Sequence, residues 1–218
     1  MKNIVRNKLA YFLILLILIS STFGISFAVN NNLFYQMGLL QKGKITGNQV
    51  PDAFGETEYK ITANNFKISI EDFNYTVKEL QLAGMEAEKA EEQAAKLLIE
   101  KYAVYNAAVA ANCIAGDEAV RAVIEDTKAG IERASNKADF YDFLSGVGMT
   151  ADEYWESQFS NVKIYESIAL YKEQCYQSFL QKGSEADSRS DVAEDKWDQY
   201  WDNTVAELIS SENVQIKE

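Results

Sequence analysis

Any chemistry in this chain of 218 residues has to come from carboxylates, thiols, hydroxyls and amines, because the sequence contains no histidine. A chain without imidazole has no Ser-His-Asp or Cys-His catalytic group and no side chain that ordinarily exchanges a proton near neutral pH. It also lacks the histidine ligands of many transition-metal sites, and its two cysteines are too few for a four-thiolate zinc site. These counts exclude several large classes of enzymes and metalloproteins.

Adjacent acidic residues are the remaining candidates for acid–base work or for calcium binding. Neighbours on a helix diverge by about 100°, so the two carboxylates of such a pair do not converge on one substrate atom. The sequence has no EF-hand spacing. We interpret the pairs as solvated helix faces, and we expect no catalytic residue, no metal site, no cofactor and no enzymatic activity. The pairs are Glu91/Glu92, Glu125/Asp126 and Asp152/Glu153.

The two cysteines leave two alternatives open. In an oxidising compartment, Cys113 and Cys175 could form a disulfide that closes a loop of about 60 residues and adds roughly 4 kcal/mol in the chain-entropy model. Otherwise both remain buried free thiols. The sequence does not decide between these alternatives.

Aromatic residues are the main positive signal for binding, since Phe, Trp and Tyr make up 12% of the chain. Aromatic side chains offer a large contact area for little lost side-chain entropy, which suits a surface that binds many apolar sequences. The plainer alternative is that they fill the core between packed helices. The candidates for binding a peptide or partner lie in the last third of the chain: Tyr154, Trp155, Phe159, Tyr165, Tyr176, Trp197 and Trp201.

The charge of the chain argues against nucleic acid as a partner. The formal net charge is −12 and the pI is near 4.6, whereas nucleic-acid binding needs a basic surface. Residues 1–28 hold three basic and no acidic residues, so the rest of the chain carries a formal charge of −15. Such an acidic surface favours solubility, and it could also receive basic or unfolded chains.

The first 28 residues have the pattern of an export signal. A basic start is followed by an apolar run over residues 9–19, and Ser26-Phe27-Ala28 places small residues where a signal peptidase cleaves. We expect cleavage after Ala28, and the alternative is an uncleaved membrane anchor over residues 9–29. Both versions place the rest of the chain outside the cytoplasm, either secreted or held at the outer face of the cytoplasmic membrane.

The remainder of the chain is predicted to form a tether and one mainly α-helical domain. Residues 29–57 are polar, contain the only proline and are expected to be a tether. Residues 58–218 form the domain, in which 58–69 alternate polar and apolar side chains around an Ala63-Asn64-Asn65 turn and predict a β-hairpin. Residues 183–194 are expected to be a polar linker. The predicted helices cover 69–84, 86–112, 117 to at least 131, 137–144, 150–181 and 195–210, and a final strand covers 214–216.

Local signals mark several helix ends. Capping boxes at Ser69–Asp72 and Thr150–Glu153 predict two helix starts. Asp117 is expected to cap the start of a third helix, and Gly146 and Gly148 are expected to end the short helix before them.

Four stretches of the domain form a recognisable series: Ile68 to Phe73 (ISIEDF), Leu97 to Ala108, Asp117 to Val120 (DEAV) and Gly148 to Tyr154 (GMTADEY). Together with the order of the elements, the series resembles the N-terminal chaperone region of the SurA/PrsA-type exported foldases over about residues 58–182. The resemblance implies a mainly α, long-helix SurA N-terminal/trigger-factor-like chaperone module with a small β-hairpin and a returning C-terminal helix and strand. It also implies that residues 214–217 pair with the strand around residues 59–62.

The chain departs from the family where a parvulin-type prolyl isomerase domain usually follows the helical region. Residues 183–194 leave no room for a domain of ~100 residues, and the histidine-rich active site of such isomerases is absent. The resemblance therefore implies an exported, ATP-independent holdase without isomerase activity, which binds unfolded or newly translocated polypeptides and meets the membrane only through its N-terminal segment. The alternative is an envelope adaptor or subunit that binds one folded partner through the Trp197/Trp201 helix. A homodimer is left open.

Overall fold

The computed structural model describes residues 33–47, 58–182 and 190–217, so the predicted signal peptide or anchor lies outside the described residues. The described part of the chain forms seven helices and three short strands, and the fold is mainly α, as predicted. Within these ranges no helix combines the length and the apolar character needed to cross a bilayer. The elements are α2 (Leu33–Gly47), β1 (Tyr59–Thr62), β2 (Lys67–Ser69), α3 (Ile70–Leu82), α4 (Ala87–Ala110), α5 (Asp117–Arg133), α6 (Lys137–Val147), α7 (Ala151–Lys182), α8 (Ser190–Ser211) and β3 (Gln215–Ile216).

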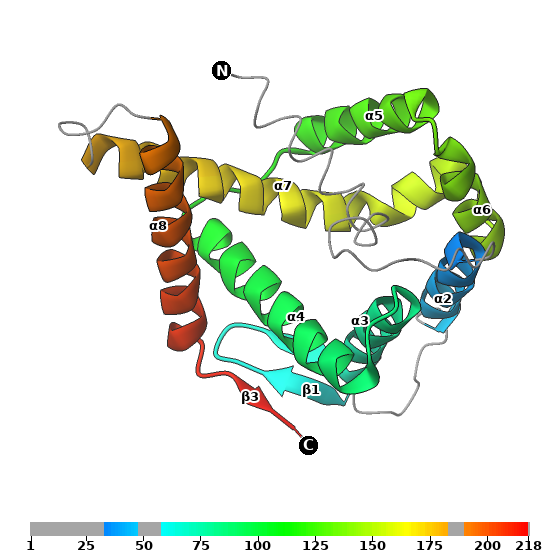
Figure 1. Ribbon diagram of the computed structural model, residues 1–218, viewed down its shortest axis with the longest axis horizontal. Coiled ribbons are helices and arrows are strands. Elements are labelled where there is room, and N and C mark those ends of the chain that lie inside the picture. The colour runs from blue at the N-terminus through cyan, green and yellow to red at the C-terminus, as the bar shows by residue number, and fades with distance from the viewer. Residues whose placement is uncertain (1–32, 48–57, 183–189, 218) are drawn as a thin grey trace.

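The longest helix, α7, organises the arrangement. Figure 1 shows it crossing the molecule from α6 to α8, with α5 along one side and α4 along the other. α8 crosses the far end of α7 and passes the end of α4 on its way to the sheet.

A three-stranded antiparallel sheet joins the first and last strands of the described chain. β1 lies between β2 and β3, and Ile61 stands opposite Ile216 in the β1–β3 ladder. The β1–β2 turn is closed by the Ala63 N–H, which donates to the carbonyl of Phe66 at 2.9 Å. The predicted hairpin and the predicted pairing of the final strand are both confirmed.

The hairpin turn also holds the C-terminal end of α8. The Asn64 N–H donates to the main-chain carbonyl of Glu212 at 2.8 Å, and the Asn64 side chain donates to the carbonyl of Ser211 at 2.9 Å. The Asn65 backbone N–H donates to the Glu212 carboxylate at 3.0 Å, and its side-chain amide donates at 3.2 Å. The Glu212 side chain is buried, so these donors offset the cost of removing its charge from water.

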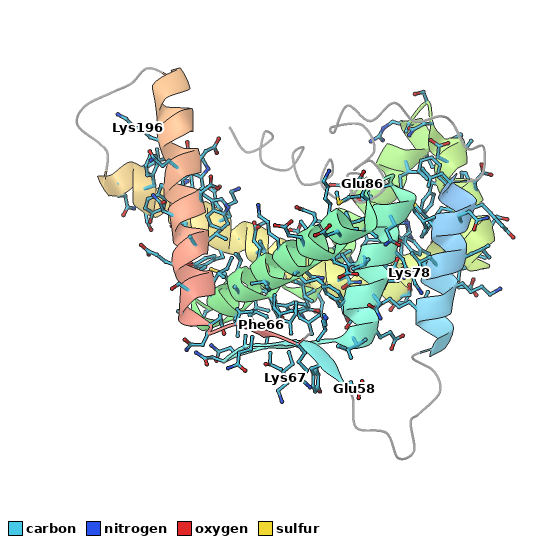
Figure 2. The ribbon with its side chains drawn as sticks, turned by 60° about the horizontal axis from the view of Figure 1, so that its bottom comes forward. Glu58, Phe66, Lys67, Lys78, Glu86 and Lys196 are labelled. Carbon is cyan, nitrogen blue, oxygen red and sulfur yellow. The ribbon has the colours of Figure 1, made fainter. Side chains whose placement is uncertain are left out.

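The apolar core has two parts, and both are built from residues on the inner faces of helices and strands. The first lies between the sheet, α3 and α4, where Phe66 stacks on Tyr102 at 5.8 Å between ring centres. Figure 2 shows Phe66 on the side of the sheet that faces α4. The second part lies between α5, α6 and the first half of α7, and its buried residues include Val120, Phe140 and Val162.

Both predicted capping boxes form. The Asp72 N–H donates to the Ser69 hydroxyl at 3.0 Å, and the Glu153 carboxylate accepts from the Thr150 backbone N–H at 2.8 Å. Asp117, by contrast, is the first residue of α5 and not its cap, because Gly116 takes the cap position and the Asp117 side chain instead pairs with Lys163 at 2.7 Å on α7. The prediction that Asp117 caps this helix was therefore wrong.

The predicted tether is wrong over residues 33–47, which form helix α2 and pack against α6. The helices meet at two glycines: a Cβ on Gly38 would lie 2.1 Å from the carbonyl oxygen of Phe143, and one on Gly146 would lie 2.2 Å from that of Tyr35. The two helices therefore meet through close contact between their backbones. They do not meet through a stripe of apolar side chains, which is the pattern that a sequence reveals. Gly146 lies inside α6, contrary to prediction, whereas Gly148 ends the helix in the left-handed conformation with φ 77°.

The predicted linker is wrong over residues 190–194, because α8 begins at Ser190. The acidic residues Asp191 and Glu194 suit the first turns of a helix, and Ala193 has a high intrinsic helix propensity, although this segment is mostly polar. Residues 183–189 lie outside the described residues.

Candidate functional site

The seven predicted binding residues fall into three places along α7 and α8. Tyr154, Trp155 and Phe159 pack on the second part of the core, and Trp155 is only 5% exposed. Tyr165 lies near the middle of α7 and is half-buried. The other three lie where α7 meets α8, and there they do come together.

Six aromatic side chains pack against one another between the end of α7 and α8. The Trp197 ring lies 5.0 Å from Tyr176, 5.7 Å from Phe179 and 6.0 Å from Trp201, measured between ring centres. The Trp201 ring also lies 6.4 Å from Tyr171. All six side chains are half-buried, and none of them belongs to either part of the core. We call this set the α7–α8 aromatic cluster: Tyr171, Tyr176, Phe179, Trp197, Tyr200 and Trp201.

The candidate list from sequence missed three members of this cluster, Tyr171, Phe179 and Tyr200. The Phe179 and Tyr200 rings lie 5.3 Å apart and join the two helices. The signal was present in the sequence, since Phe179 follows Tyr176 and Tyr200 follows Trp197 at i+3, a spacing that places two rings on one helix face.

Charged side chains border the α7–α8 aromatic cluster. Lys172 Nζ lies 4.8 Å from the centre of the Trp201 ring, a favourable cation–π geometry. Asp198 and Asp202 are exposed on α8 next to the two tryptophans in the sequence. The border therefore carries charges of both signs around an apolar surface.

The aromatic residues at the start of α7 are enclosed instead. Trp155 stacks on Phe140 at 6.1 Å, and Tyr154 meets Phe143 edge-to-face at 5.2 Å. The indole N–H of Trp155 has no hydrogen-bond partner among the described residues. Phe159 is half-buried beneath Arg121, whose guanidinium carbon lies 5.0 Å from the ring centre. We call Phe140, Phe143, Tyr154 and Trp155 the inner aromatic group.

Polar side chains from α2, α3, α4 and α7 form a separate cluster around Tyr165. Lys101 Nζ lies 4.9 Å from the centre of the Tyr165 ring and 5.4 Å from that of Tyr102. Lys44 Nζ lies 2.8 Å from the carboxylate of Asp72. The Tyr75 hydroxyl donates to Gln41, which links α3 to α2. We call this set the central polar cluster: Gln41, Lys44, Asp72, Tyr75, Glu79, Lys101, Tyr102 and Tyr165.

Burial shifts the proton equilibria of the central polar cluster. It lowers the pKa of Lys101 to about 8, and the positive charge of Lys44 acts in the same direction, while Asp72 and Glu79 oppose it. Burial raises the pKa of the Glu79 carboxyl above its usual range. Burial also raises the pKa of Tyr165 to about 12. Each shift favours the neutral form, as expected where charges are removed from water.

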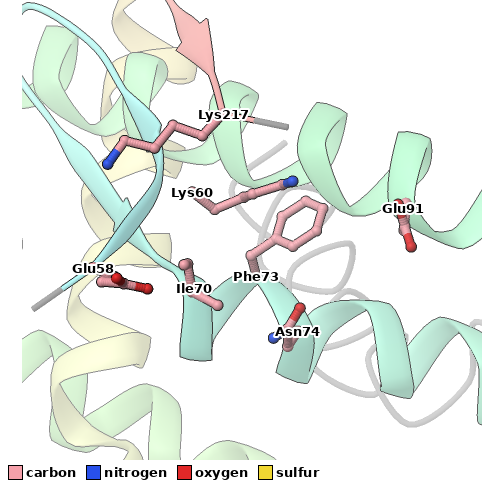
Figure 3. A pocket seen from close by; sticks show the side chains of 7 residues that line it. All are labelled: Glu58, Lys60, Ile70, Phe73, Asn74, Glu91 and Lys217. Atoms are coloured by element: carbon pink, nitrogen blue, oxygen red, sulfur yellow. The ribbon is translucent and has the colours of Figure 1, made fainter.

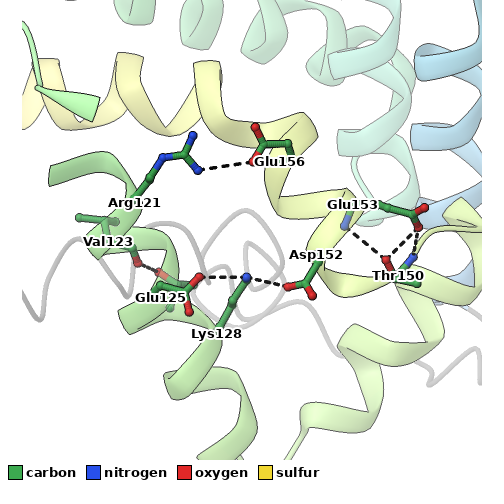
Figure 4. A network of polar contacts seen from close by, with 9 residues as sticks. Arg121, Val123, Glu125, Lys128, Thr150, Asp152, Glu153 and Glu156 are labelled. Carbon is green, nitrogen blue, oxygen red and sulfur yellow. Dashed lines mark hydrogen bonds and ion pairs between the residues drawn. The ribbon is translucent and has the colours of Figure 1, made fainter. Parts of the chain in front are cut away.

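Two small cavities lie elsewhere on the molecule. One, of about 350 Å³, lies between α5 and α7 beside Trp155. Its lining includes two ion pairs, from Lys128 to Asp152 at 2.8 Å and from Arg121 to Glu156 at 3.7 Å (Figure 4). These charges already have partners of opposite sign within the chain.

The other cavity, of about 310 Å³, lies beside the sheet (Figure 3). Its lining combines Lys60, Lys217 and two glutamates with the ring of Phe73, which lies 5.7 Å from Lys60 Nζ. Trp155 is the one predicted site residue that lines either of these two cavities. Across the described ranges, no three cysteine, aspartate or glutamate residues are grouped so that they could hold a metal ion.

No protein-family model, curated protein or solved structure matches the chain. The resemblance to the SurA/PrsA-type foldases stays a prediction from the sequence motifs.

Proposed function

We propose that this protein is an exported, ATP-independent holdase that binds unfolded or newly translocated polypeptides on the α7–α8 aromatic cluster. The observation that carries the proposal is the position of this cluster: six half-buried rings lie outside both parts of the core. Aromatic side chains that do not fill a core remain available to a partner, and partly exposed apolar patches commonly mark binding surfaces.

The chemistry of the cluster suits extended chains of varied sequence. Ring faces and edges accept many apolar side chains without one fixed geometry, so each contact is weak and release is fast. Leu180, which is 43% exposed, follows Phe179 and extends the apolar surface along α7. No nucleotide is needed for a binding cycle that depends on such contacts alone.

Two exposed aspartates of α8 favour the same use. Asp198 and Asp202 keep the apolar surface hydrated, and the formal charge of −12 repels other copies of the chain. A basic or partly basic client would be attracted by the same field. The proposed location outside the cytoplasm rests on the export pattern of residues 1–28.

The experiment that tests the proposal is aggregation of two unrelated unfolding clients, followed by light scattering in the presence of the full chain. We expect both clients to be protected, and we expect Trp197→Ala and Trp201→Ala each to weaken protection several-fold while circular dichroism shows an intact fold. Tyr141→Ala is the matched control, because Tyr141 is 45% exposed on α6 and does not belong to the cluster.

Two results would contradict the proposal. No protection at several-fold molar excess would exclude a general holdase. Equal protection by the wild-type chain and both tryptophan variants would exclude the α7–α8 aromatic cluster as the binding surface. If protection is absent but one stoichiometric partner copurifies and is lost in Trp197→Ala, the adaptor alternative replaces the holdase.

A further inference from the structure

The connection between α4 and α5 is fastened along α7 by two polar contacts. The Ala115 N–H donates to the hydroxyl of Ser167 at 3.0 Å, and the Cys113 thiol donates to the side-chain oxygen of Gln174 at 2.7 Å. Ser167 is fully buried and Ala115 is 2% exposed, so the connection packs directly against the helix. The connection runs antiparallel to α7, because Cys113 contacts Gln174 and the later residue Ala115 contacts the earlier helix residue Ser167.

Cys175 lies on the side of α7 that faces this connection. Ser167, Tyr171 and Cys175 are spaced at i, i+4 and i+8, which places all three on one helix face. Burial raises the pKa of the Tyr171 hydroxyl to about 12 and also raises the pKa of the Cys175 thiol, and the nearby Cys113 acts on both groups in the same direction. Gln174, the present acceptor of the Cys113 thiol, is the chain neighbour of Cys175. The two sulfur atoms therefore belong to one group of side chains.

From this placement we infer that Cys113 and Cys175 are a site of thiol oxidation, at which a small-molecule disulfide converts them into an intramolecular disulfide. Both cysteines are free thiols and both are half-buried, so a small oxidant reaches them while a large one does not. Cys113 lies beyond the end of α4, after Asn112 in the left-handed conformation with φ 57°. Because its backbone is not helical, Cys113 can turn from the Gln174 oxygen towards Cys175, the next residue of α7.

The reaction is a double thiol–disulfide exchange. One cysteine thiolate attacks the small disulfide, forms a mixed disulfide with one half of it and releases the other half as a thiolate. The second cysteine thiolate then attacks the protein-bound sulfur of the mixed disulfide, forms the Cys113–Cys175 bond and releases the remaining half. Two electrons pass from the protein to the small disulfide, which leaves as two thiols after taking up the two thiol protons.

The disulfide would fasten the α4–α5 connection to α7 beneath the α7–α8 aromatic cluster. Tyr171 precedes Cys175 by one turn of α7, and its ring centre lies 6.4 Å from that of Trp201. Tyr171 therefore links the two cysteines to the α7–α8 aromatic cluster, so oxidation of the thiols acts on the cluster through this one side chain. The inference itself does not depend on the holdase proposal, because bond formation is measured without a client.

The test exposes the full chain to oxidised glutathione and, in parallel, to dithiothreitol, and compares intact masses, iodoacetamide labelling and thermal unfolding. We expect a monomer that has lost both thiol hydrogens and no longer reacts with iodoacetamide. We also expect its unfolding midpoint to rise by about 5 °C or more, because the bond restricts the unfolded chain over a long loop. Dithiothreitol should reverse all three changes.

Cys113→Ser and Cys175→Ser are the matched controls. Each variant should keep the fold by circular dichroism, accept a single glutathione adduct and show the same unfolding midpoint under both conditions. Covalent dimers, or a wild-type monomer that carries two glutathione adducts without ring closure, would overturn the inference. So would a rise in the unfolding midpoint that persists in Cys113→Ser, whose mutated side chain lies outside any helix.

Discussion

Helix α7 contributes aromatic rings to two sets that have different surroundings. At its start, Tyr154 and Trp155 pack against Phe140 and Phe143 of α6, and Trp155 and Phe140 are each 5% exposed. Near its end, the rings of the α7–α8 aromatic cluster pack between α7 and α8, and they remain half-buried. The number of elements that cover a helix face therefore separates the buried rings from the half-buried ones.

The strongest test of this comparison removes one ring from the inner aromatic group and one from the α7–α8 aromatic cluster. Trp155→Ala should lower the free energy of unfolding by about 3–5 kcal/mol, because it leaves a cavity in a closed part of the core. Trp197→Ala should cost about 1 kcal/mol, since its ring is already partly in water. Urea unfolding of both variants measures the difference, and equal losses would show that the two regions are equally structural.

A second prediction concerns the contact between α2 and α6, the helix that carries Phe140 and Phe143 of the inner aromatic group. Gly38→Ala should destabilise the protein by about 1–3 kcal/mol, because the added methyl group meets the carbonyl of Phe143. Gly43→Ala on the same helix is the control: nothing lies within 4 Å of the added atom, so it should stabilise by about 0.5–1 kcal/mol through helix propensity. The same sign for both variants would show that α2 does not pack on α6 through Gly38.

A third prediction concerns the charged group between the two aromatic regions. In the folded chain the pKa of Lys101 is about 8, whereas an unfolded lysine has a pKa near 10.4. Between these values the folded chain binds fewer protons, so the free energy of unfolding rises with pH through this window. Lys101→Met should remove this rise, which is on the order of 1–3 kcal/mol.

Urea unfolding of both proteins at pH 7.5 and at pH 10 measures the Lys101 contribution. Tyrosines that titrate in the unfolded chain affect both proteins alike, so the difference between the two profiles isolates the lysine. Parallel profiles would show that Lys101 is solvated in the folded chain.

The prediction with the smallest expected effect on stability concerns the exposure of the Trp155 and Trp197 rings to solvent. A chain in which Trp197 is the only tryptophan should be quenched by acrylamide several-fold more strongly than one in which Trp155 is the only tryptophan. Both chains are made with tryptophan-to-phenylalanine changes, which preserve most of the packing. Similar quenching constants would show that Trp155 and Trp197 are equally exposed, and that the inner aromatic group and the α7–α8 aromatic cluster do not differ in exposure.

Local signals in the sequence predicted the elements but not their partners. The Ser69 and Thr150 capping boxes and the hairpin turn depend on neighbouring residues, and all three form. The α2–α6 contact depends on two glycines more than a hundred residues apart, which leave no periodic pattern to read. The split of the aromatic residues into two sets could not be predicted either, because α7 is one continuous helix whose partner changes along its length.

The closure of the sheet by the last residues of the chain sets an order on folding. Contacts between Asn64 or Asn65 and the end of α8 span 147 residues, so they form only after the chain up to residue 212 is available. A chain that emerges from its N-terminus can build the hairpin and the first part of the core early, but β1 then has one unpaired edge until β3 arrives. Such an edge can add a strand from another molecule, and contacts this distant in sequence form slowly. Pairing of β3 with β1 therefore removes the free strand edge through which the folding protein could associate with another molecule.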